Sequence, residues 1–109
     1  MTLADLTARA DAIRALYAQQ ETERDGRPWN RAELALGFVG DVGDLAKLVM
    51  AREGRRPSRH QDLDAALAHE LADCLWSVLV LAKAYEVDLG TAFTRTMNEL
   101  EQKLSPPSP

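Results

Sequence analysis

Four acidic side chains stand in two pairs that could act together on a cation. Asp41 and Asp44 are three residues apart, and so are Glu70 and Asp73. This spacing places both members of a pair on one face of a helix. Either pair alone is typical of a solvated helix face. Both pairs, however, adjoin strongly apolar sequence, and packing of two such helices would strip each carboxylate of water at a cost of several kcal/mol.

A divalent cation is the compensation that these residue types favour. The apolar run beside the second pair, residues 71–82, contains no lysine or arginine. Mg²⁺ and Mn²⁺ both prefer carboxylate oxygens, and Mg²⁺ retains water molecules that a phosphate can displace. Helical bundles build such sites from acids that face inward on neighbouring helices. The sequence therefore predicts a Mg²⁺ site, with Mn²⁺ as an alternative ion, between two helices.

Hydrophobic periodicity predicts the helices that must position these acids. We expect four, over about 2–17, 29–52, 61–85 and 88–104, because apolar residues recur at steps of three and four. Thr2 and Asp88 have the residue types of N-caps. The polar run 19–27 is expected to end the first helix, and Pro28 suits the first turn of the second. With no alternating strand pattern and no glycine-rich phosphate loop, the prediction is an all-α four-helix bundle.

The third predicted helix is apolar around its whole circumference. Ten of the twelve residues from Leu71 to Ala82 are apolar, and a helix of this kind must be buried on all sides. Three other short helices can hardly surround it, so a second subunit is expected to cover the rest. Trp76 is accordingly assigned to the core or to a subunit interface. The sequence predicts a homo-oligomer, as a dimer or a tetramer.

Composition limits the class of protein. The chain has 109 residues and a net charge of −4, which predicts one domain over 1–104 and argues against nucleic acid as the main partner. The Pro/Ser-rich segment 105–109 is predicted to be disordered. The N-terminus does not resemble a signal peptide, and the apolar run 71–82 is too short to span a bilayer. Cys74 is the only cysteine. We expect a cytoplasmic protein that does not enter the membrane.

Two motifs then carry a family resemblance. The segment 36–46, LGFVGDVGDLA, resembles the MazG-like pattern in which E-x-x-E opens a "GEVGELAE" stretch. The segment 69–75, HELADCL, resembles the partner motif E-x-x-D, and the segment 86–89, EVDL, is similar to the family's "GIDL" before the last helix. Asn98 and Glu99 resemble the Asn-Glu pair that follows. Order and spacing agree from about Trp29 to Leu100.

The resemblance implies a fold, an activity and a ligand set. MazG-like proteins are all-α NTP pyrophosphatases that hydrolyse nucleoside triphosphates between the α and β phosphates, often to remove unwanted nucleotides. They bind Mg²⁺ through the four motif acids and form dimers and tetramers. The implied metal-binding and catalytic residues in this sequence are Asp41, Asp44, Glu70 and Asp73.

The sequence also departs from the family pattern. Both acids of the first motif are Asp rather than Glu, so each carboxylate is one methylene shorter. Thr94, followed by Arg95, replaces a lysine in the last helix, and a Ser stands at Ser77 where a tyrosine is usual. These changes leave open a rival interpretation: a family member without catalytic activity that binds nucleotide or only oligomerises. A sister enzyme of the same fold, phosphoribosyl-ATP pyrophosphohydrolase, is a further alternative.

Several other residues are candidates for substrate binding. Trp29 could stack on a nucleobase or anchor the start of its helix on the core. Asn98 could donate a hydrogen bond to substrate, or simply occupy a polar helix position, and Arg95 is a neighbouring cation. The basic loop 52–59 could contact phosphates, but we expect it to be solvated. His69 is expected to be a surface histidine.

Overall fold

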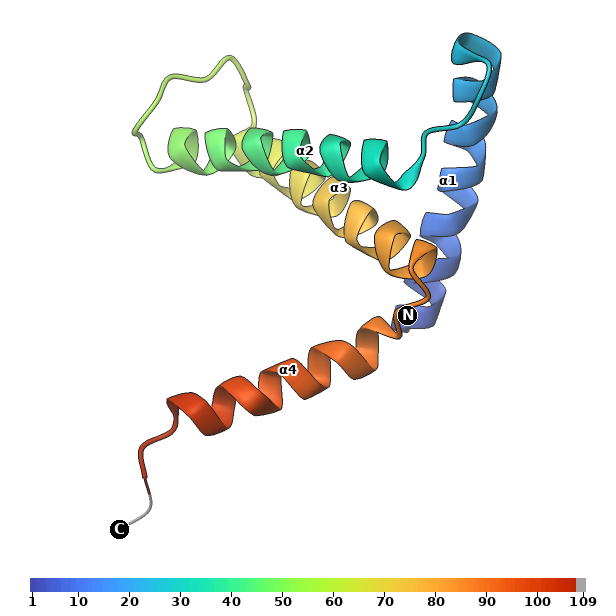
Figure 1. Cartoon of the computed structure of the whole chain (residues 1–109). Helices are drawn as coiled ribbons and strands as arrows, with labels where there is room; N and C mark the ends of the chain where they lie inside the picture. The colour runs from blue at the N-terminus through green and yellow to red at the C-terminus, as the bar shows by residue number, and fades with distance from the viewer. Residues whose placement is uncertain (108–109) are drawn as a thin grey trace.

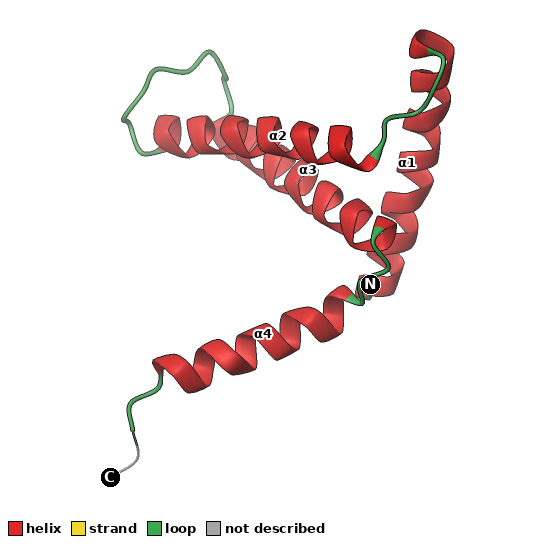
Figure 2. Ribbon diagram, viewed as in Figure 1, coloured by secondary structure: helices red, strands yellow, loops and turns green. Residues whose placement is uncertain are grey.

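The computed structural model describes residues 1–107, which form four helices and no strand. The helices are α1 (Leu3–Asp25), α2 (Arg31–Arg52), α3 (Leu63–Ala84) and α4 (Leu89–Leu104) (Figures 1 and 2). The predicted all-α fold of four helices is therefore confirmed. Ser105 ends α4 as its C-cap. The predicted disorder of the tail stays a prediction, and residues 108 and 109 of that tail lie outside the described residues.

Each helix begins at a polar side chain that accepts a hydrogen bond from a backbone N–H of its first turn. The N-caps Thr2 and Asp88 are those predicted from sequence, and Asn30 and Asp62 cap α2 and α3. Such a cap contributes about 1 kcal/mol. The ends of the elements that carry the four acids are thus determined locally.

One predicted boundary is confirmed and one is wrong. The first helix ends within the polar run 19–27 as predicted, but only at Asp25, eight residues beyond the last apolar residue of its predicted stripe, and Glu21 within this extension is buried. The helix ends at Gly26, whose φ of 84° lies in the left-handed region that glycine adopts at little cost. Pro28 is not in the first turn of α2, which begins only at Arg31 after the Asn30 cap.

The helices pack unevenly. α2 and α3 lie side by side as an antiparallel hairpin, α1 packs across α3, and α4 leads away from the other three (Figure 1). The radius of gyration is 17.5 Å, whereas a compact domain of this length has about 13 Å. The buried core is correspondingly small and consists of Ala10, Leu79 and Val80.

A single chain leaves much of its apolar surface uncovered. On α3 only Ser77, Leu79 and Val80 are buried. Leu36 on α2 is 70% exposed and Phe93 on α4 is 62% exposed. Soluble monomers rarely expose apolar patches of this extent. The uncovered surface is what the predicted homo-oligomer requires, and the oligomer itself stays a prediction.

α3 is long and apolar enough to cross a membrane by length and composition alone. It has 22 residues, and its most apolar stretch has a mean hydropathy of 1.5. Residues 71–82 are too short to span a bilayer, but the whole of α3 is long enough. Core helices of soluble proteins commonly have the same character, and Glu70 and Asp73 on this helix would be costly in lipid.

Candidate metal centre

The packing of α2 against α3 brings the predicted acids together. Asp41, Asp44 and Glu70 each offer a carboxylate oxygen, and these oxygens lie within 4.8 Å of one another. Asp73, one turn further along α3, is not part of this group. Its Oδ2 lies 3.2 Å from Nε2 of His69. The structure thus places three of the four predicted ligands at one point, with the fourth beside them.

The carboxylates of this cluster lack the partners that buried acids usually have. Asp41 and Glu70 are half-buried, whereas Asp44 is exposed. Oε2 of Glu70 is buried without any hydrogen-bond partner, which is costly for a carboxylate oxygen. Within residues 1–107, no lysine or arginine forms an ion pair with any of the three. An oxygen-rich, uncompensated cluster of this kind fits a hard divalent cation.

The electrostatics of the cluster agree with its geometry. Burial, followed by the charges of Asp73 and Asp44, raises the pKa of Asp41. Burial, followed by the charges of Asp73, Asp41 and Asp44, raises the pKa of Glu70. The ionised forms are therefore disfavoured in the metal-free fold, and a bound cation would reverse this.

Cys74 lies next to the acids but is not suited to bind metal. Burial and the neighbouring carboxylates raise the pKa of its thiol, so the thiol stays protonated and unreactive.

An aromatic cavity adjoins one side of the cluster. It has a volume of about 630 Å³ and is lined by Tyr17, Trp29 and Trp76, with Asp41 and Asp73 at its acidic edge. The rings of Tyr17 and Trp76 meet edge to face, with centroids 5.5 Å apart. Nε1 of Trp76 donates a hydrogen bond to the carbonyl of Ala10, so Trp76 anchors α1 on α3. A mostly apolar cavity beside a few polar groups is typical of a small-molecule site.

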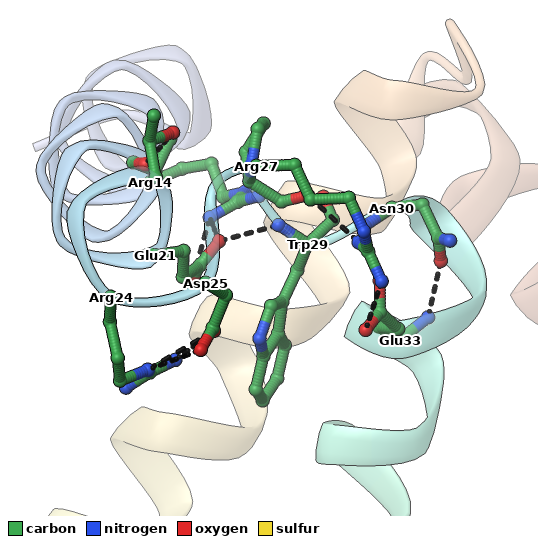
Figure 3. A network of polar contacts seen from close by, with 11 residues as sticks. Arg14, Glu21, Arg24, Asp25, Arg27, Trp29, Asn30 and Glu33 are labelled. Carbon is green, nitrogen blue, oxygen red and sulfur yellow. Dashed lines mark hydrogen bonds and ion pairs between the residues drawn. The ribbon is translucent and has the colours of Figure 1, made fainter.

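A buried ion pair holds Trp29 at this cavity. Arg14 Nη1 lies 3.0 Å from Glu21 Oε1, and the same carboxylate oxygen accepts a hydrogen bond from the backbone N–H of Trp29 at 2.7 Å. Nη2 of Arg14 donates to the carbonyl of Trp29 at 2.9 Å. Figure 3 shows Glu21 next to Arg14 and the start of the Trp29 segment. The sequence pattern did not predict this network, although Arg14 and Glu21 are seven residues apart and so share a helix face.

Gly37 allows the Trp29 ring to approach α2. A Cβ at this position would lie 3.1 Å from Cζ3 of the ring, closer than such contacts normally are. Both interpretations of Trp29 therefore have support, because the ring packs on a helix and also lines the cavity.

The candidates on α4 lie elsewhere. Arg95 and Asn98 line a shallow surface hollow formed only by α4 residues. The aromatic cavity includes no residue of α4, and neither does a second cavity that lies beside Asp44 and Glu70. One chain therefore does not bring Arg95 or Asn98 to the acidic cluster.

The fold and the site together define an all-α protein with an acidic centre between two antiparallel helices, suited to a divalent cation and flanked by an aromatic cavity. Residues 32–105 match the family model of the MazG nucleotide pyrophosphohydrolase domain, and the chain belongs to this family.

The chain is also similar to curated proteins named dCTP pyrophosphatase 1. It is 35% identical to the protein of Rattus norvegicus over 95 residues, which cover 84% of this chain and 56% of that protein. It is 34% identical to the protein of Homo sapiens over 90 residues, which cover 79% of this chain and 53% of that protein. The chain thus spans about half the length of these relatives. No solved structure matches significantly.

Proposed function

We propose that this chain is a Mg²⁺-dependent nucleoside triphosphate pyrophosphohydrolase that yields a nucleoside monophosphate and pyrophosphate. One observation carries the proposal: Asp41, Asp44 and Glu70 converge within 4.8 Å, and no lysine or arginine of residues 1–107 forms an ion pair with them. Membership of the MazG family supports the same reaction.

The chain's own residues have separate roles in this reaction. Asp41, Asp44 and Glu70 would hold the cation, with Asp73 beside them. When bound, a divalent cation polarises phosphate oxygens and neutralises their charge. A carboxylate of the cluster orients the attacking water and accepts its proton. The His69 contact fixes the orientation of the Asp73 carboxylate.

The nucleobase would lie in the aromatic cavity. Trp29 offers a ring for stacking, a contact that contributes about 1–3 kcal/mol per base. The relatives in rat and human are named for dCTP, so deoxycytidine triphosphate is the first substrate to test. The role is removal of unwanted nucleotides from the cytoplasmic pool.

Arg95 and Asn98 belong to this proposal as residues of a neighbouring subunit. α4 projects away from α2 and α3, the helices that carry the acidic cluster (Figure 1), and its apolar residues Phe93, Met97 and Leu100 are exposed. Packing of this helix on a second copy would cover them and carry Arg95 and Asn98 to a site in a homodimer or tetramer.

The reaction is tested with a panel of canonical and modified nucleoside triphosphates. With Mg²⁺ or Mn²⁺ present, we expect pyrophosphate release from at least one of them and no release after chelation of the metal. If no substrate yields pyrophosphate, the proposed enzymatic activity is contradicted. If Mg²⁺ or nucleotide nevertheless stabilises the protein, the result favours a family member that binds nucleotide without catalysing its hydrolysis.

The assembly is tested by light scattering at micromolar concentration. We expect at least twice the chain mass of 12.0 kDa, because water would otherwise face the exposed apolar residues of α3. Leu75 is 45% exposed in one chain and would be covered in the assembly. A charge at this position would therefore disrupt the contact, so Leu75→Glu should lower the measured mass. Gln61→Glu adds the same charge at an exposed position outside the helices and should not. A wild-type mass near that of one chain would refute the assembly.

A further inference from the structure

A second cavity lies on the other side of the acidic cluster. It has a volume of about 920 Å³ and is bounded by α2, α3 and the loop 53–62 that joins them. Asp44 and Glu70 lie on one wall. The rest of the lining includes three cationic side chains, those of Lys47, Arg56 and Arg59, together with His60, His69 and the Asp62 carboxylate that caps α3.

The lysine and the two arginines of this lining have no ion-pair partner among the described residues 1–107. Arg52 at the base of the loop, by contrast, is 2.8 Å from Asp64. Three unpaired positive charges thus line a cavity that also reaches the cation-binding acids. A ligand that contacts both the three cations and the acids must be an anion. A divalent cation would have to lie between that anion and the carboxylates.

The loop that carries the arginines has a defined course at both ends. Gly54 adopts φ 74°, and the N–H of Arg55 donates to the carbonyl of Met50 at 2.8 Å, which turns the chain away from α2. At the other end Asp62 caps α3 through the N–H of Ala65. The loop residues are exposed, as the sequence predicted, yet Arg56 and Arg59 still line the cavity.

The two cavities divide the four acids between them. Asp41 and Asp73 line the aromatic cavity, whereas Asp44 and Glu70 line the second cavity, which also contains the loop arginines. A nucleoside triphosphate is divided in a matching way, with an aromatic base at one end and its most anionic phosphates at the other. Its α–β bridge would then lie over the acids.

We propose that Lys47, Arg56 and Arg59 bind the β- and γ-phosphates, the part of the substrate that leaves as pyrophosphate. This assignment rests on the pyrophosphohydrolase activity proposed above. The oxygen of water joins the α-phosphorus, the bond from that phosphorus to the bridging oxygen breaks, and its electron pair departs with the pyrophosphate. Negative charge therefore grows at the end that the arginines face, and arginine binds phosphate oxygens through two parallel N–H groups.

The test is calorimetric binding of inorganic pyrophosphate in the presence of Mg²⁺, together with the kinetics of triphosphate hydrolysis. The double variant Arg56→Ala/Arg59→Ala should weaken pyrophosphate binding about 100-fold or more, at about tenfold per lost charge-assisted contact. Binding of a nucleoside monophosphate should change less than twofold. KM for the triphosphate should rise as pyrophosphate binding weakens. Arg55→Ala removes a neighbouring charge of the same loop that does not line the cavity, and should leave all three values unchanged.

Two failures can be told apart. If the wild type hydrolyses a triphosphate but the double variant binds pyrophosphate as tightly as Arg55→Ala, the loop assignment is overturned and the activity stands. If the wild type hydrolyses nothing, the proposed function fails; selective loss of pyrophosphate binding in the double variant would still support an anion site. A wild-type protein that does not bind pyrophosphate with Mg²⁺ overturns the assignment directly.

Discussion

Glu70→Gln is expected to reduce turnover by more than about 100-fold and, without metal, to make the protein at least as stable as the wild type. Loss of a residue that merely supports a metal ligand already costs about 10–100-fold, so loss of a ligand should cost more. The stability result follows from repulsion, because the substitution removes one of several like charges that lie within 4.8 Å. A pyrophosphate-release assay measures turnover, and thermal melts with and without Mg²⁺ measure stability. Mg²⁺ should stabilise only the wild type.

The stability difference between the two proteins should depend on pH in a defined direction. The pKa of Glu70 is raised in the fold from its ordinary value of 4.5. The folded protein thus binds this proton more tightly than the unfolded chain. The resulting stabilisation is fully present below the unfolded pKa and is lost as pH rises through the folded one. Glu70→Gln should therefore be the more stable protein near neutral pH, and its advantage should shrink as pH falls toward 4.5.

A matched control for Glu70→Gln is available on α4. Glu101→Gln neutralises an exposed acid on α4 and should leave turnover and the Mg²⁺ effect unchanged. A Glu70→Gln protein that melts well below the metal-free wild type would identify Glu70 as structural, because an acid in a structural ion pair leaves a stranded cation when it is removed.

Glu21→Ala is expected to lower the free energy of unfolding by about 3 kcal/mol, the cost of breaking a buried ion pair. The side chains of Arg14 and Glu21 are only 14% and 8% exposed, so removal of the carboxylate leaves a largely buried guanidinium without its partner. The backbone N–H of Trp29 loses its acceptor as well. The total free energy of unfolding of a domain of this size is about 5–15 kcal/mol. Denaturant unfolding at neutral pH measures the change.

Glu23→Ala provides a matched comparison for this experiment. Glu23 lies two residues further along α1 and is exposed, so its removal should change stability by no more than about 0.5 kcal/mol. Equal effects of the two substitutions would show that the network does not stabilise the α1–α2 connection. Loss of order in that connection should also change Trp29 fluorescence in Glu21→Ala alone.

The helices and most of the acidic centre follow from the amino-acid sequence alone. Apolar periodicity is a local property, and N-caps such as Thr2 and Asp88 act within one turn, so these elements follow from neighbouring residues. The three-residue spacing within each acidic pair is local too. The apolar sequence around Glu70 indicated that its carboxylate would lose water, and the raised pKa of this group has burial as its first cause.

How those elements pack against one another depends on contacts that the sequence pattern does not contain. The register of α2 against α3 brings Asp44 to Glu70 but leaves Asp73 beside His69, and that register depends on contacts between distant segments. Glu21 belongs to a polar run in the sequence, and it is buried because Arg14, two turns earlier on α1, pairs with it while the backbone N–H of Trp29, beyond the end of α1, donates to it. From the sequence, the arginines of the loop were expected to be solvated. They form a candidate phosphate site only because the packing of α2 and α3 brings them to the same cavity as Asp44 and Glu70.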